Sequence, residues 1–171
     1  MTLGEHDRSM RFAHTLAMIG SPLLILFAAS LETGRHINPP VKPEHTIQEN
    51  LDVPPDVDAM LHKSCFDCHS SETRWPWYSN VSGLGHFVES DVAGARQAMN
   101  FSEWSTGVGK TPVQGGAMLL AACEAVRQHI MPKPNYLLLH PEATPQPAEI
   151  EEFCGWARSE AAELMQANRR P

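Results

Sequence analysis

Two cysteines separated by two residues and followed directly by a histidine constrain this chain more than any other feature. They form the run Cys65-Phe66-Asp67-Cys68-His69, the pattern that attaches haem covalently to protein. Two thiols at this spacing at the end of a helix can each form a thioether with one vinyl group of a porphyrin. The histidine is then held under the ring centre, where its imidazole can bind iron. We therefore predict one covalent haem c on Cys65 and Cys68, with His69 as an axial iron ligand.

Two other chemistries use the same cysteine spacing. A thioredoxin-like redox pair is expected after a strand within a β-α-β unit, and the sequence has no such pattern. A zinc site would need two more ligands at recognisable spacing. Cys123 and Cys154 are available, but they form no second pair of this kind and are not close together. Haem attachment is the favoured interpretation, with zinc and chance occurrence as alternatives.

The iron of such a haem has a second axial position, for which Met131 is the favoured ligand. This residue follows a predicted helix and directly precedes Pro132, which breaks the helix and lets the thioether point into a pocket. Methionine opposite histidine raises the reduction potential relative to two histidines, which suits electron transfer. The alternatives are an open or water-bound position, or coordination by His86, His129, His140, Met99 or Met118.

An apolar stretch near the N-terminus indicates export. Residues 12–31 contain no Asp, Glu, Lys or Arg, and Arg8 and Arg11 precede them. Basic residues before an apolar segment keep the start of the chain in the cytoplasm and send the rest across the membrane. Residues 1–31 are therefore either a signal peptide cleaved at Ala28-Ala29-Ser30 or an uncleaved anchor, since ~20 apolar residues span a bilayer. Both interpretations place the haem domain in the periplasm, either free or anchored to the inner membrane.

The rest of the chain is predicted to be all-α. Residues 32–54 are polar and rich in proline, which indicates an extended linker or wrap, and residues 55–171 form the predicted haem-binding domain. Apolar spacing predicts helices from Pro54-Pro55 to Cys65, over about 84–99, over about 117–129 and from Thr144-Pro145 onward, with a loop over 101–116. Their apolar faces consist of Val57, Met60 and Leu61; Leu84, Phe87, Val88, Val92, Ala95 and Met99; Leu119, Leu120, Cys123 and Val126; and Ile150, Phe153, Cys154, Ala157, Ala161 and Leu164.

Longer segments of the chain resemble the bacterial haem-binding domain family, within the cytochrome c group. They are residues 64–80 (SCFDCHSSETRWPWYSN), 100–104 (NFSEW) and 131–143 (MPKPNYLLLHPEA), and residues 34–40 (GRHINPP) are similar to the family's lead-in. The similarity covers about residues 33–158. Residues 82–85 depart from the family, which often has a more apolar, tryptophan-containing segment there.

This resemblance implies a cytochrome c-like helical fold with one haem. It assigns Cys65, Cys68, His69 and Met131 the roles given above. We expect the first and last helices of this fold to pack near one another around the haem.

The segment shortly after the pentapeptide contains four further candidates for haem binding, which are Arg74, Trp75, Trp77 and Tyr78. Aromatic rings with a polar tip can pack the haem edge, and arginine suits the propionate carboxylates. The alternative is a buried loop anchor without haem contact.

A disulfide between Cys123 and Cys154 is predicted, because the two residues lie on two predicted helices of an exported chain. Exported proteins form disulfides in an oxidising compartment. The alternative is two buried free thiols.

The expected function is one-electron transfer by a c-type cytochrome that is not an enzyme. A net charge of −7 argues against nucleic-acid binding, which needs a basic face, and fits docking to a basic patch on a partner. The expected partners are periplasmic or membrane redox proteins, including the other subunits of a larger redox complex, and the membrane itself if residues 12–31 are uncleaved. The alternatives are a haem enzyme or a gas or redox sensor with an open sixth position, and a module in which the haem is structural.

Overall fold

The computed structural model describes residues 36–169, and within them every regular element is an α-helix or a short 3-10 helix. The all-α prediction is confirmed for this part of the chain. The predicted signal or anchor at residues 1–31 lies outside the described residues. Between residues 36 and 169, no helix combines the length and the apolar character needed to cross a bilayer. The elements in chain order are η1 (Pro43–His45), α2 (Ile47–Asn50), α3 (Pro55–Ser64), α4 (Phe66–His69), η2 (Trp77–Asn80), α5 (Leu84–Ala98), η3 (Phe101–Glu103), η4 (Val108–Lys110), α6 (Pro112–Arg127), α7 (Pro134–Leu137), η5 (Pro141–Ala143) and α8 (Pro147–Ala167).

Among the described residues, 76–88 form one compact part, and residues 36–75 and 89–169 form another. The first part contains η2 and the start of α5. There the rings of Trp77 and Tyr78 meet edge to face, with centroids 5.8 Å apart, and Leu84 and Phe87 are largely exposed. The predicted apolar face of α5 is therefore buried only beyond this part, at Val92 and at Met99 just after the helix.

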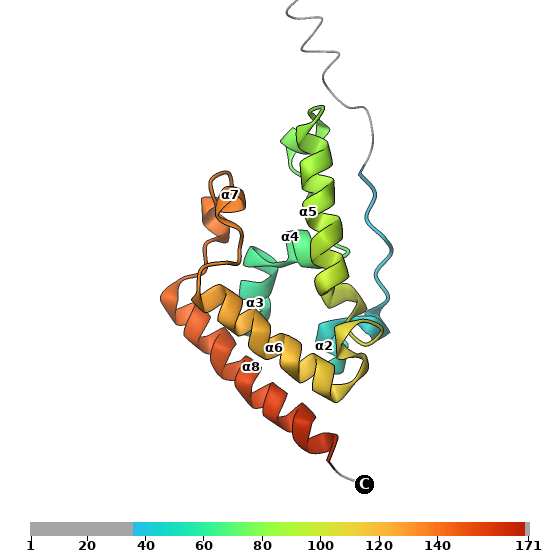
Figure 1. The fold of residues 1–171 in the computed structure, drawn as a ribbon, viewed down its shortest axis with the longest axis vertical. Coiled ribbons are helices and arrows are strands. Elements are labelled where there is room, and N and C mark those ends of the chain that lie inside the picture. The colour runs from blue at the N-terminus through green and yellow to red at the C-terminus, as the bar shows by residue number, and fades with distance from the viewer. Residues whose placement is uncertain (1–35, 170–171) are drawn as a thin grey trace, which may run out of the picture. The chain divides into compact units, whose positions relative to one another are not determined.

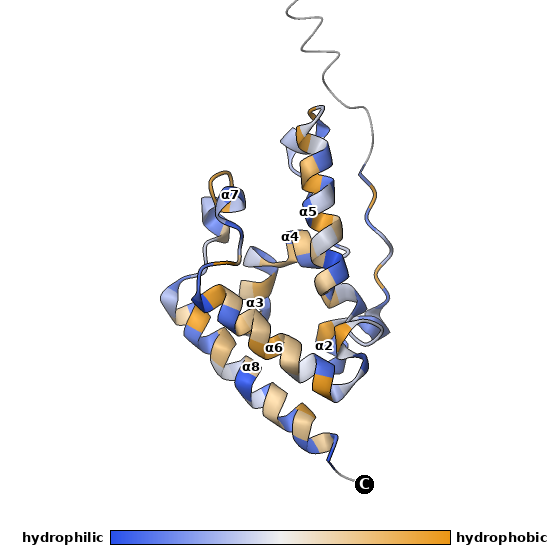
Figure 2. Cartoon of the chain, viewed as in Figure 1, coloured by the Kyte–Doolittle hydropathy of each residue, from blue (hydrophilic) through white to orange (hydrophobic). Residues whose placement is uncertain are grey.

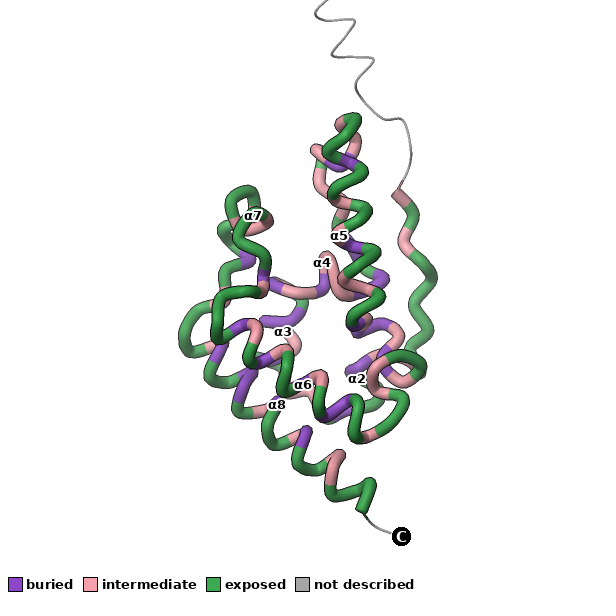
Figure 3. The backbone as a smooth tube through the Cα atoms, viewed as in Figure 1, coloured by how far each residue is buried: buried purple, intermediate pink, exposed green. Residues whose placement is uncertain are grey.

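The second part is organised around helices α6 and α8, which pack side by side along most of their lengths (Figure 1). Hydrophobic residues alternate with hydrophilic ones along both helices (Figure 2). Buried positions likewise alternate with exposed ones (Figure 3). On α8 the buried residues are Ile150, Phe153, Cys154, Ala157 and Ala161. This set contains all but Leu164 of the predicted apolar face, and Leu164 packs against the core while partly exposed.

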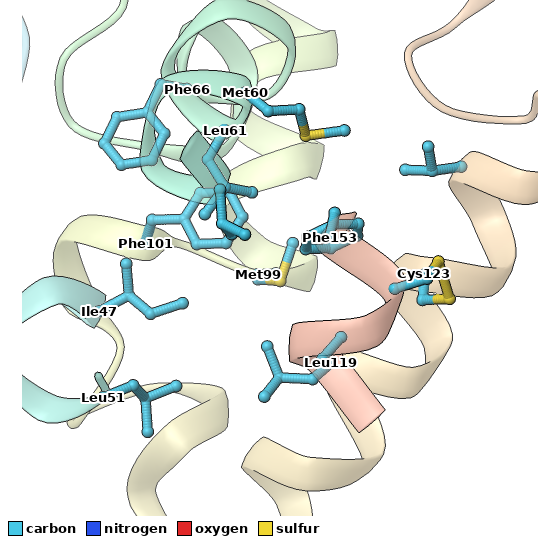
Figure 4. Close-up of a cluster of buried hydrophobic side chains, with 14 of the residues drawn as sticks. Ile47, Leu51, Met60, Leu61, Phe66, Met99, Phe101, Leu119, Cys123 and Phe153 are labelled. Carbon is cyan, nitrogen blue, oxygen red and sulfur yellow. A yellow bond between two sulfur atoms is a disulfide. The ribbon is translucent and has the colours of Figure 1, made fainter. Parts of the chain in front are cut away.

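Helix α3 also contributes buried side chains to the core. Its buried residues include the predicted Val57, Met60 and Leu61, and α3 packs against α8 as expected for the first and last helices. Lys63 Nζ on α3 donates to Glu149 Oε2 on α8 at 2.6 Å. Figure 4 shows Met60 and Leu61 of α3 in the same hydrophobic cluster as Met99 and Phe101, which follow α5.

The described part of the predicted linker, residues 36–54, also contributes to this core. Residues 36–42 have no regular structure, and the chain then enters η1 and α2. Ile47 is fully buried and Leu51 nearly so, and both belong to the main hydrophobic cluster. For residues 36–54, this packing agrees with a wrap against the domain rather than a free linker.

Helix α6 begins at Pro112 rather than near residue 117, so the predicted loop over 101–116 is too long. Thr111 caps the helix by accepting from the backbone N–H of Gln114 at 3.3 Å. Gly115 and Gly116, which favour a loop by their own preferences, lie inside the helix, where the packing leaves little room for a side chain. A Cβ on Gly115 would lie 3.3 Å from Trp104 Cζ2, and one on Gly116 would lie 3.2 Å from the carbonyl oxygen of Ala161 on α8.

Helix α8 begins at Pro147, so the predicted start at Thr144-Pro145 is wrong by two residues. Gln146 is the N-cap residue, and its backbone N–H donates to Glu149 Oε2 at 2.6 Å. The glutamate at the third position of the helix thus accepts from the N-cap backbone, as in a capping box.

The disulfide prediction is confirmed, since the sulfur atoms of Cys123 on α6 and Cys154 on α8 lie 2.05 Å apart. Both residues are buried. The bridge therefore joins the two longest helices of the described chain inside their contact.

Candidate functional site

The cysteine-histidine pentapeptide forms a single helical turn immediately after α3. The backbone N–H of Cys65 donates to Leu61 at the end of α3, at 2.8 Å. The N–H groups of Cys68 and His69 both donate to the carbonyl oxygen of Cys65, at 3.2 and 2.9 Å. Residues three and four apart in a helical turn lie on one face. Both thiols and the imidazole are therefore presented on the same side of α4.

Phe66 holds this turn against the core. Its side chain is buried and stacks on Phe101, with ring centroids 5.2 Å apart, and on His62, with centroids 3.8 Å apart. A buried aromatic ring at the second position of the motif fixes the rotation of the turn about its axis. The two cysteines are only half-buried, on the part of the turn that Phe66 does not use.

The ring of His69 is oriented by a backbone carbonyl. Its Nδ1 lies 3.0 Å from the carbonyl oxygen of Met99. A carbonyl oxygen can only accept a hydrogen bond, so Nδ1 carries the proton and Nε2 keeps a free lone pair. Burial lowers the pKa of His69, although hydrogen bonding to the backbone of Met99 and of Ala95 opposes this, and the lowered pKa favours the neutral ring that binds metals. Histidines that bind metals usually donate their other N–H in this way, so the residues present fit a haem iron.

The two thiols do not fit thiolate chemistry. Burial, together with the charge of Cys68, raises the pKa of Cys65 to about 12. Burial, together with the carboxylate of Asp67, raises the pKa of Cys68 to about 11. Redox-active cysteines require lowered pKa values instead. The zinc interpretation loses its extra ligands, because Cys123 and Cys154 are consumed by their disulfide.

Asp67, between the two cysteines, accepts hydrogen bonds from two distant parts of the chain. Arg74 donates to it through Nε and Nη2, each at 3.0 Å, and Tyr136 donates through its hydroxyl, also at 3.0 Å. Burial alone would raise the pKa of Asp67, but the hydrogen bonds from Arg74 and Tyr136 outweigh it and hold that pKa below its usual value. Sequence analysis did not single out Asp67 or Tyr136.

Met131 lies in the loop that leads from α6 to α7. Its backbone N–H donates to Ala125 at 3.1 Å, and its half-buried side chain packs against the core cluster. Lys133 in the same loop pairs with Asp91 on α5, with Nζ and Oδ1 2.7 Å apart. After burial, the charge of Lys133 is a further cause that lowers the pKa of His69. The segment that follows Met131 reaches the pentapeptide directly, because Tyr136 on α7 donates to Asp67 Oδ2 at 3.0 Å.

The alternative iron ligands lie in different surroundings. Met99 is in the core, and its carbonyl oxygen accepts from His69 Nδ1, on the opposite side of the ring from Nε2. The His140 ring stacks on Tyr136, and its Nδ1 lies 3.1 Å from Glu142 Oε1. Met118 packs against the core, and His129 is exposed on the turn after α6. His86 is exposed in the part formed by residues 76–88.

The remaining predicted haem contacts are distributed over both parts of the structure. Arg74 is largely exposed, with its guanidinium on Asp67. Trp75 stacks on His36, with ring centroids 4.4 Å apart, and donates from Nε1 to Asn38 at 3.0 Å. Trp77 and Tyr78 belong to residues 76–88 and contact each other there.

A second polar network fixes the chain just after His69. Arg96 on α5 donates from Nε to the carbonyl oxygen of Ser70 at 2.7 Å and from Nη2 to Asn38 and Thr73, at 3.0 and 2.9 Å. Asn38 in turn donates to the Thr73 carbonyl oxygen at 2.8 Å. Neither Arg96 nor Asn38 was predicted from the sequence as part of the site. A usable signal was the position of Arg96, four residues after the buried Val92 on the same helical face.

Comparison with known proteins identifies one family. The model of the haem-binding domain family matches residues 23–159. No curated protein matches the chain, and no solved structure matches it.

Proposed function

The chain belongs to the haem-binding domain family, and on this basis we propose that it is a c-type cytochrome. Cys65 and Cys68 hold one haem through thioether bonds, and His69 and Met131 bind its iron. Bound haem supplies a one-electron couple between ferric and ferrous iron. The protein acts as an electron carrier rather than as an enzyme.

The orientation of His69 is the observation that carries this proposal. Its Nδ1–H is committed to the Met99 carbonyl oxygen at 3.0 Å, so Nε2 is the atom left to bind iron. The same turn presents two protonated thiols on the side of the imidazole. Covalent attachment and axial ligation need these three groups together, and a redox-active thiol pair would not need the histidine.

The surrounding residues set the conditions for electron transfer. Phe66 and Phe101 pack behind the turn with less than 5% of their surface exposed, and Phe101 also meets the His69 ring edge-on, with centroids 6.3 Å apart. Apolar cover of this kind lowers the local dielectric and keeps water from the proximal ligand. Met131 would close the opposite side with a thioether, a ligand that raises the reduction potential.

We propose a location outside the cytoplasm, in the periplasm or at the outer face of the inner membrane. The buried bridge between Cys123 and Cys154 supports this, because structural disulfides persist in oxidising compartments. The basic and apolar pattern of residues 8–31 supports it from the sequence. Redox proteins of the same compartment are the proposed partners.

The decisive experiment is to produce the full chain with and without haem-maturation machinery. We expect the matured protein to gain the mass of one haem, and to keep its colour after denaturation and extraction with acid and organic solvent. A pyridine haemochrome spectrum should report two saturated vinyl groups. Cys65→Ala/Cys68→Ala should lose the covalent haem, whereas Cys123→Ala/Cys154→Ala removes two cysteines elsewhere and should keep it. A matured protein without colour and without added mass contradicts the proposal.

Ligand binding separates electron transfer from a haem enzyme or gas sensor. With Met131 on the iron, the ferrous protein should bind carbon monoxide slowly or weakly, and a reversible one-electron titration should be observed. Met131→Ala should bind carbon monoxide rapidly. Rapid binding by the unaltered protein would favour a function with an open sixth position.

A further inference from the structure

We propose that Asp67 and Tyr136 form a positioning pair, which holds the Met131 loop against the haem-attachment turn. The inference rests on the proposed function, because it gives the loop a purpose only if Met131 binds the iron. Neither residue need touch the haem for this role. They act through the placement of the methionine.

The contact joins the two segments that would supply opposite iron ligands. Asp67 lies inside the pentapeptide, one residue before Cys68, and Tyr136 lies on α7, five residues after Met131. The Tyr136 hydroxyl donates to Asp67 Oδ2 at 3.0 Å across a sequence separation of 69 residues. A hydrogen bond to a carboxylate is among the stronger side-chain contacts in proteins.

Arg74 keeps the carboxylate in the right orientation. Its Nε and Nη2 donate to the two different oxygens of Asp67, a two-point contact that fixes the plane of the carboxylate. The Asp67 side chain is only 14% exposed, whereas that of Arg74 is 71% exposed. The arginine therefore fixes the acceptor from the solvent side, and the buried side remains for Tyr136.

Beyond the packing of Met131 on the core cluster and the burial of Pro132 at the start of the loop, few contacts hold the segment that carries Tyr136. Helix α7 has no buried residue, and Figure 3 shows that most of the chain around α7 is exposed. The pair between Lys133 and Asp91 has both side chains more than 40% exposed, and exposed ion pairs of this kind contribute little. The half-buried contact from Tyr136 to Asp67 is the best placed of the loop's polar contacts to set its position. Because it joins α7 to the attachment turn, this contact restricts where the methionine of the same loop can lie.

Imidazole competition measures this positioning directly. Imidazole can bind ferric iron only when Met131 leaves it, so a loop that is easier to displace gives tighter imidazole binding. We expect Tyr136→Phe, which keeps the ring on His140, to bind imidazole about tenfold more tightly than the unaltered holoprotein. Asp67→Asn should act in the same direction, and the effect of Tyr136→Phe should shrink in that background. The matched control is Thr106→Val, which removes another hydroxyl-to-carboxylate bond, from Thr106 to Glu103 at 2.7 Å, and should leave imidazole affinity unchanged.

Met131→Ala distinguishes failure of the pair from failure of the proposed function. If Met131→Ala binds imidazole more tightly but Tyr136→Phe matches Thr106→Val, the positioning pair is overturned and the ligand assignment stands. If Met131→Ala equals the unaltered protein, Met131 is not the ligand and both proposals on this loop fall. Haem content and far-UV circular dichroism, measured on each variant, show whether it is folded. If Tyr136→Phe does not fold, the Asp67→Asn comparison decides by the same criterion.

Discussion

His69 Nδ1 lies 3.0 Å from the backbone carbonyl oxygen of Met99, and this contact joins the pentapeptide to the end of α5. The acceptor belongs to the main chain, so its chemistry does not depend on which side chain follows the helix. It fixes both the tautomer and the direction of the imidazole.

The first prediction concerns this tautomer. In apoprotein made without haem maturation, His69 should be neutral at neutral pH with its proton on Nδ1, because the Met99 carbonyl oxygen can only accept. Two-bond nitrogen–proton correlation spectra of labelled histidine rings distinguish the two tautomers. The Nδ1 proton should also exchange slowly with water. A His69 ring protonated on Nε2 would contradict the geometry and would block the atom proposed to bind iron.

The second prediction concerns the bridge between α6 and α8. Loss of the disulfide in Cys123→Ala/Cys154→Ala should lower the free energy of unfolding by roughly 3–4 kcal/mol in the chain-entropy model, given the loop that it closes. Urea denaturation measures this. Cys65→Ala/Cys68→Ala, compared as apoprotein, removes two thiols outside the bridge and serves as the control. Alkylation of the unreduced, denatured apoprotein should modify two cysteines, and modification of all four would rule out the bridge.

Local periodicity was enough to predict α3 and the buried face of α8. Val57, Met60 and Leu61 recur at helical spacing, and so do Ile150 and the residues that follow it. The disulfide followed from the same reasoning, because it needed only two buried helices and an oxidising compartment. These features depend on neighbours a few residues apart, which a single sequence displays.

The start of α6 depends on tertiary packing and could not be predicted in this way. Gly115 and Gly116 indicate a loop by their own preferences. In the structure they lie within α6, where Trp104 and α8 approach the backbone so closely that a Cβ would be crowded. Phe87 shows the opposite case: its spacing predicts an apolar face, but periodicity does not say whether anything covers that face, and 70% of its surface is exposed.

The residues of the candidate site also differ in whether the sequence alone could predict them. Cys65, Cys68 and His69 are recognisable because their spacing is local. Asp67 with Tyr136, and Asn38 with Arg96, are contacts between residues 69 and 58 positions apart. Hydrogen bonds over such distances leave no periodic trace in one sequence, so these partners became evident only with the fold.

The third prediction concerns the packing of Trp104, which is 2% exposed. A Cβ on Gly109 would lie 2.2 Å from Trp104 Nε1, so Gly109→Ala must displace the indole or the loop. We expect a loss of about 1–3 kcal/mol in the free energy of unfolding, as for other overpacked sites. Gly155→Ala is the matched control, because a Cβ there meets nothing within 4 Å. That substitution should stabilise α8 by about 0.5–1 kcal/mol, and equal effects of the two would contradict the packing.

The last prediction is a pH dependence carried by Glu149. The Gln146 backbone N–H, followed by Lys63, lowers the pKa of this carboxyl, and both donate to its Oε2 at 2.6 Å. A carboxyl whose pKa is lower in the folded state stabilises the fold above its unfolded pKa, and the contribution disappears as pH falls through the folded pKa. Glu149→Gln should therefore cost about 1 kcal/mol at pH 7, and the deficit should vanish in acid. Urea midpoints measured against pH test this, with Glu151→Gln, exposed on the same helix, as a control that should follow the unaltered protein. A deficit that stays constant down to acid pH would mean that the charge of Glu149 does not hold α3 and the start of α8 together.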